Sequence, residues 1–66
     1  MTKETAARRI AMIPSAIKGT KENLIVVLKR NAERGEEWND QKCIDAHEGQ
    51  VNAMKKQLRE AMEVLA

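Results

Sequence analysis

Aromatic residues are almost absent from this sequence, which contains one tryptophan, Trp38, and neither phenylalanine nor tyrosine. Aromatic side chains bury the largest areas per residue, so a core made only of aliphatic residues and methionine is weak for its size. With 66 residues, the chain is also below the size at which one hydrophobic core comfortably offsets chain entropy. We therefore expect one small domain, residues 1–66, that works in association with another chain.

Cysteine and long apolar runs are equally scarce. The single cysteine, Cys43, excludes an intramolecular disulfide. The longest apolar run, residues 24–28, is far too short to span a bilayer, and the polar N-terminus leads into no signal-peptide core. We expect a protein that is made in the cytoplasm and not inserted into a membrane, and any export would use a route without a cleaved signal peptide.

Apolar residues recur at three- and four-residue steps in both halves of the chain, and alternation with a period of two is absent. This spacing is typical of an apolar stripe on an α-helix, and it is close to the seven-residue repeat of helices that wrap around each other. Ala61 belongs to the second stripe, and the polar residues Thr20, Asn31 and His47 occupy matching positions. The residues predicted to form helix–helix interfaces are Ile10, Ile13, Ile17, Leu24, Val27, Leu28, Ile44, Val51, Met54, Leu58 and Leu65.

The pattern predicts an all-α fold with helices at about residues 3–33 and 39–65, joined by a turn at about 34–38. Pro14 should kink the first helix or start it, because proline cannot donate the backbone hydrogen bond of a helix interior. A start at Pro14 would leave residues 1–13 as a separate turn of helix or a loose arm, and we favour the kink because Ile10 and Ile13 stay in phase with Ile17. Arg34 and Gly35 read as a helix C-terminus, and Asn39 or Asp40 as the N-cap of the second helix. A short connection makes antiparallel neighbours, so we expect a two-helix hairpin that pairs into a four-helix bundle, as a dimer or a hetero-complex.

Charge is divided between the two halves. Residues 1–35 carry eight basic and three acidic residues, a net +5, and residues 36–66 carry four basic and seven acidic residues, a net −3. These halves could complement each other within or between hairpins, or they could be ordinary solvated faces. A basic first helix could also attract nucleic acid, but no aromatic residues accompany the basic ones, so we do not expect nucleic-acid binding.

Between the two predicted helices, residues 35–41 read Gly-Glu-Glu-Trp-Asn-Asp-Gln. This turn resembles that of the WXG superfamily, small helical hairpins associated with type VII (ESX) secretion. The usual motif is Trp-any-Gly, and one branch has Trp-any-Asp with a glycine a few residues earlier, which Gly35, Trp38 and Asp40 fit. Members often carry an aromatic residue eight positions after the tryptophan, where this sequence has Ala46, and the C-terminal export signal of aromatic-then-acidic type is absent.

The resemblance implies a secretion substrate, or an adaptor or partner of a longer secreted protein, with no catalytic activity and no cofactor. Gly35, Trp38 and Asp40 would form the turn motif and part of a partner-contact surface. Trp38 has a second interpretation, as a plug that closes the hairpin by packing on Leu28 or Ile44. The alternative function is a generic oligomerisation or small regulatory module, of the antitoxin-like or phage-encoded kind.

Four residues whose side chains could take part in chemistry lie close together in the second helix: Asp40, Cys43, His47 and Glu48. The first three share one face of that helix. Structural zinc needs four ligands, and no second Cys/His pair is present, so we predict no metal. A Cys–His nucleophile pair would lack a pocket for its substrate. Cys43 is either a half-buried small residue or a thiol that cross-links a dimer.

Overall fold

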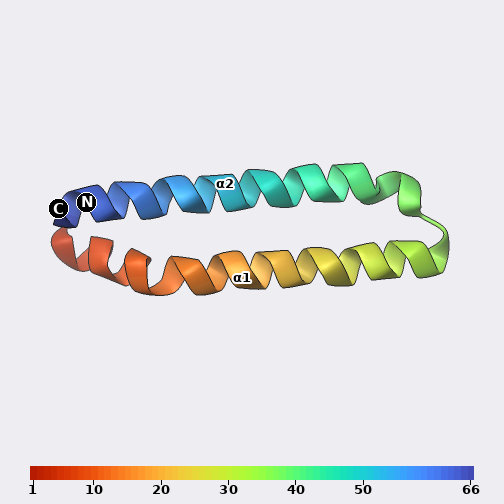
Figure 1. Ribbon diagram of the computed structural model, residues 1–66, viewed down its shortest axis with the longest axis horizontal. Coiled ribbons are helices and arrows are strands. Elements are labelled where there is room, and N and C mark those ends of the chain that lie inside the picture. The colour runs from red at the N-terminus through yellow and green to blue at the C-terminus, as the bar shows by residue number, and fades with distance from the viewer.

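The computed structural model of the chain describes residues 1–66 as two long helices joined by a tight turn. Helix α1 spans Lys3–Arg34, the 3₁₀ turn η1 spans Glu37–Asn39, and helix α2 spans Asp40–Leu65. The two helices pack against each other in antiparallel orientation, and both chain termini lie at the end opposite the turn (Figure 1). The prediction of an all-α helical hairpin is confirmed.

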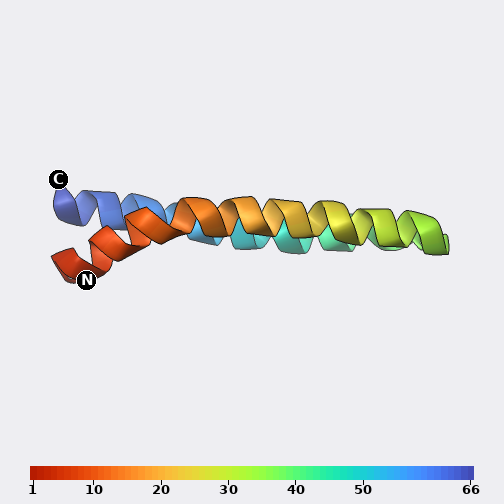
Figure 2. The same ribbon diagram turned by 90° about the horizontal axis from the view of Figure 1, so that it is seen from below.

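Helix α1 continues through Pro14 without interruption. Its N-terminal part turns away from the axis of the remainder and lies at an angle to α2 (Figure 2). Proline is the usual cause of such a bend, since it lacks the N–H group and its ring crowds the preceding turn. The helix begins at a cap that was not predicted from the sequence: the Thr2 hydroxyl oxygen accepts a hydrogen bond from the Thr5 backbone N–H at 3.1 Å.

The end of α1 has the expected glycine cap. Gly35 adopts a left-handed conformation with φ of 72°, and its N–H donates to the Ala32 carbonyl at 3.2 Å. The next N–H, of Glu36, donates to the Asn31 carbonyl at 2.7 Å, so two of the last carbonyls of the helix are satisfied. This reversal directs the chain into η1 and the return helix.

We expect Gly35→Ala to lower the free energy of unfolding by about 1 kcal/mol, because a Cβ is strained at positive φ. Gly49→Ala is the matched control: Gly49 lies inside α2, and an added Cβ there meets no atom within 4 Å. That change should stabilise the protein by up to about 1 kcal/mol through helix propensity. Urea denaturation followed by circular dichroism tests the pair, and equal shifts of the same sign would contradict the left-handed cap.

The start of α2 differs from the prediction of a side-chain cap. Asn39 occupies the N-cap position, but its backbone is in the right-handed helical region and its side chain makes no capping hydrogen bond. The Asn39 N–H instead donates to the Glu36 carbonyl at 3.0 Å, because η1 leads directly into α2. Asp40 is the first residue of α2, where its carboxylate suits the positive end of the helix dipole.

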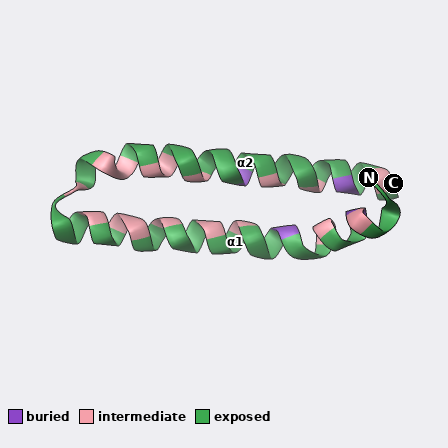
Figure 3. Ribbon diagram, turned by 180° about the vertical axis from the view of Figure 1, so that it is seen from behind, coloured by how far each residue is buried: buried purple, intermediate pink, exposed green.

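Very little of the chain is buried. Only four of 66 residues are buried, namely Ala6, Ile13, Val51 and Ala61, and no large side chain is completely covered. Half-buried residues follow the facing sides of the two helices, whereas the outer sides are exposed (Figure 3). The hairpin therefore has a seam between its helices, but no enclosed core.

The dimensions and the accessible surface of the molecule show how far the hairpin departs from a compact shape. The hairpin measures 48 × 15 × 12 Å and has a radius of gyration of 15.1 Å, whereas a compact chain of this length would have about 11 Å. Its accessible surface is 5115 Å², compared with about 4,200 Å² for a compact monomer of the same mass. Roughly 900 Å² is thus exposed beyond what a compact monomer would expose, close to the area that one partner contributes to a standard protein–protein interface.

Neither helix has a stretch that is both long and apolar enough to cross a bilayer.

Candidate interaction surface

The predicted interface residues lie mainly on the seam between α1 and α2. Of the eleven, Ile13 and Val51 are buried, eight are half-buried, and Leu65 is exposed. At the open end of the hairpin Val64, not Leu65, is half-buried. Each half-buried residue keeps part of its side chain in contact with water. The seam is therefore enclosed by α1 and α2 on two sides and exposed to solvent along its two flanks.

Other large apolar residues are exposed outright and were not among the predicted interface positions. These are Met1, Met12, Ile25, Val26 and Met62. Ile25 and Val26 belong to the apolar run at residues 24–28, and five consecutive apolar residues must occupy more than one face of a helix. That run was the signal in the sequence that α1 presents apolar side chains beyond the seam.

Trp38 does not close the end of the hairpin. It lies within η1 with 76% of its surface exposed, so the expected packing on Leu28 or Ile44 is wrong. The 3₁₀ turn is the reason, since it presents the indole to solvent before α2 begins. The second interpretation of Trp38, as a contact for another molecule, is the one compatible with this position.

The closed end is held by a polar pair instead. The side-chain amide of Asn31 donates to the Asp40 carboxylate at 3.0 Å and lies 3.9 Å from the Cys43 sulfur. Asn31 is in the last turn of α1, and Asp40 is the first residue of α2. This half-buried hydrogen bond fixes the register of the two helices at the turn, the role expected of a polar residue in a helical seam.

Asp40 and His47, two of the residues considered as metal ligands, have other partners. Asp40 accepts from Asn31, and the Nδ1 atom of His47 lies 2.7 Å from the backbone carbonyl oxygen of Cys43. A carbonyl only accepts, so Nδ1 carries the proton of this bond and Nε2 remains available. No group of three or more His, Cys, Asp or Glu side chains is arranged to hold a metal ion.

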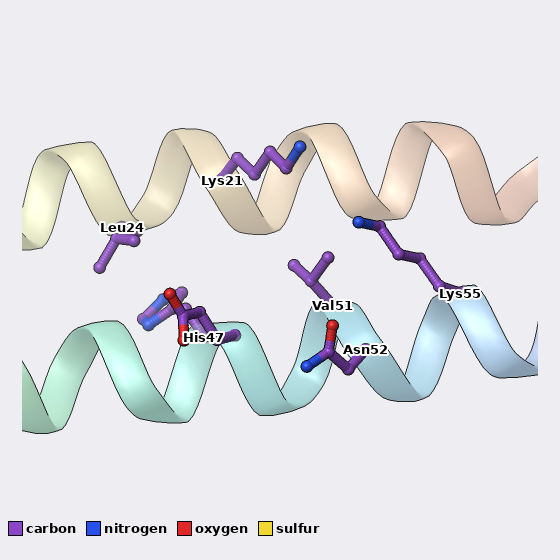
Figure 4. Close-up of a pocket in the computed structure, with 7 residues that line it drawn as sticks. Lys21, Leu24, His47, Val51, Asn52 and Lys55 are labelled. Atoms are coloured by element: carbon purple, nitrogen blue, oxygen red, sulfur yellow. The ribbon is translucent and has the colours of Figure 1, made fainter.

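A hollow of about 440 Å³ lies between the helices near the middle of the hairpin. Its apolar lining consists of Leu24 from α1 and Val51 from α2, and five polar residues complete it (Figure 4). These polar residues are Lys21, His47, Glu48, Asn52 and Lys55. The hollow combines an apolar floor with a rim that is cationic on balance, because its lining contains two lysines and one glutamate.

Comparison with known proteins gave no match, whether to a family model, to a curated protein or to a solved structure.

Proposed function

We propose that this chain is a non-enzymatic, WXG-like helical hairpin that acts by pairing with a second hairpin in a four-helix bundle. Its role would be that of a type VII secretion substrate, or of an adaptor or partner for a longer secreted protein. The pairing rests on the exposed apolar surface, and the link to secretion rests on the turn motif.

The surplus of roughly 900 Å² of accessible surface carries the pairing proposal. A two-helix hairpin cannot cover both flanks of its own seam, and a second hairpin laid along it would cover them. The resulting interface would be of standard size, about 800 Å² from each partner. Antiparallel helices joined by short turns are the usual units of four-helix bundles.

The turn supports the more specific part of the proposal. Gly35 provides the left-handed residue that ends α1, and Asp40 opens α2 two residues after Trp38. Between them, Trp38 presents a large exposed indole. Tryptophan is among the residues that contribute most to protein–protein affinity, so this side chain suits recognition by another protein.

Molar mass in solution, measured by light scattering after size exclusion, tests the pairing. We expect two chains or a small multiple, or else a single chain with little helical content that becomes helical with its partner. A single chain that is fully helical and unfolds cooperatively at every concentration would show that the hairpin needs no second layer, and would contradict the proposal.

A further inference from the structure

We infer that the hollow bounded by Lys21 and Lys55 is a binding site for an acidic amphipathic helix from a different protein, and that its lysines disfavour pairing with a second copy of this chain. The inference rests on the proposed pairing of hairpins and adds the identity of the partner: a helix with an apolar residue flanked by glutamate or aspartate.

Any partner that covers the whole length of the hairpin must contact the hollow, because the hollow lies near the middle of both helices. Lys21 lies near the middle of α1, which spans Lys3–Arg34, and Val51 lies near the middle of α2, which spans Asp40–Leu65. A second hairpin that covers the seam from end to end must therefore cross the hollow. The partner residues that cover the hollow therefore determine how well the charges match at the centre of the interface.

The two lysines belong to opposite walls of the same hollow. Lys55 extends from α2 toward α1, and the side chain of Lys21 runs along α1 toward the same region, above Val51 (Figure 4). Both residues are exposed, and Glu48 is the only acidic residue in the lining. The hollow thus offers an incoming helix an apolar floor with two ammonium groups beside it, which fits an apolar side chain with carboxylates next to it.

A second copy would fit this centre poorly. Closed dimers have two-fold symmetry, so residues near the axis meet their own equivalents. With two hairpins in full overlap the axis passes close to the hollow, and Lys21 and Lys55 would face the same two lysines of the other copy. Four ammonium groups would then share two carboxylates, and like charges brought together at an interface oppose association. An acidic partner replaces this repulsion with attraction.

The double variant K21Q/K55Q tests the inference, with K29Q/K56Q as its matched control. The control removes the same charge from exposed lysines that do not line the hollow. Self-association is measured by analytical ultracentrifugation at low and high salt. Calorimetry follows the binding of two synthetic leucine-containing amphipathic peptides, one with glutamate and one with lysine on the flanks.

For K21Q/K55Q we expect self-association about tenfold tighter and binding to the glutamate peptide about tenfold weaker, with little change in the control. The conservative variant K21R/K55R should bind the glutamate peptide like the unmodified chain. Equal changes in the test and control variants would overturn the inference and leave the pairing proposal standing. Inorganic phosphate that displaced the peptide at equal stoichiometry would assign the hollow to small anions instead. A folded chain that neither self-associates nor binds either peptide would overturn both proposals.

Discussion

Val51→Asp is expected to unfold the hairpin, with helical circular dichroism at 222 nm falling by more than half at 25 °C. Val51 is one of only four buried residues and is 8% exposed in the middle of α2. An aspartate there would place a carboxylate among the apolar contacts of the seam, and the exposed lysines Lys21 and Lys55 would offset only part of a desolvation cost of several kcal/mol. A domain of this size has little stability in reserve, about 3–5 kcal/mol at most from a single core.

Val26→Asp is the matched control, because Val26 is also a valine within a long helix but is 49% exposed. The same chemical change on the outer side should alter the free energy of unfolding by only about 0.5 kcal/mol. Equal loss of helix in the two variants would mean that Val51 and Val26 are equally covered in solution, and the seam described here would be wrong. Both proteins are compared at the same low concentration, so that assembly does not mask the difference.

The sequence was sufficient to predict the hairpin because its helical signals agree with one another. The apolar stripe has a single periodicity in each half, and it places Ile13 and Val51 where the structure buries them. Gly35 was predictable as a cap because few other residues tolerate positive φ. Pro14 was predictable as a bend rather than a helix start because Ile10 and Ile17 remain in phase on either side of it.

The features that were predicted wrongly depend on the three-dimensional geometry of the turn and of the helix packing, which the spacing of apolar residues does not specify. Asn39 has the right chemistry for a cap, but the 3₁₀ turn puts its backbone in a helical conformation, from which its side chain does not cap the helix. The same turn decides the exposure of Trp38. The hollow could not be predicted either, since Lys21 and Lys55 come together only through the register of the two helices. In the sequence they are ordinary surface lysines.

The exposed position of Trp38 distinguishes between its two interpretations and leads to the second large effect. Trp38→Ala should leave the free energy of unfolding within about 0.5 kcal/mol of the unmodified chain, because a side chain that is 76% exposed contributes little packing. Partner binding should weaken far more, by about 2 kcal/mol or roughly thirtyfold, as expected for a tryptophan that a partner covers at an interface. Urea denaturation measures the first quantity. The second is measured by producing the tagged chain in a bacterium with a type VII system and quantifying the secretion components that co-purify.

Met12→Ala provides the control for loss of exposed apolar surface, since Met12 is 69% exposed and lies near the opposite end of the hairpin. It should retain both stability and the co-purifying secretion components. A Trp38→Ala protein that lost several degrees of thermal stability and kept its partners would restore the plug interpretation, and the indole would have to pack differently in solution. Unchanged stability together with an unchanged set of partners would remove Trp38 from any function, and with it the main support for a WXG-like role. Loss of the secretion components from Trp38→Ala alone would tie that role to the turn, because Met12→Ala also removes an exposed apolar side chain but leaves the turn unchanged.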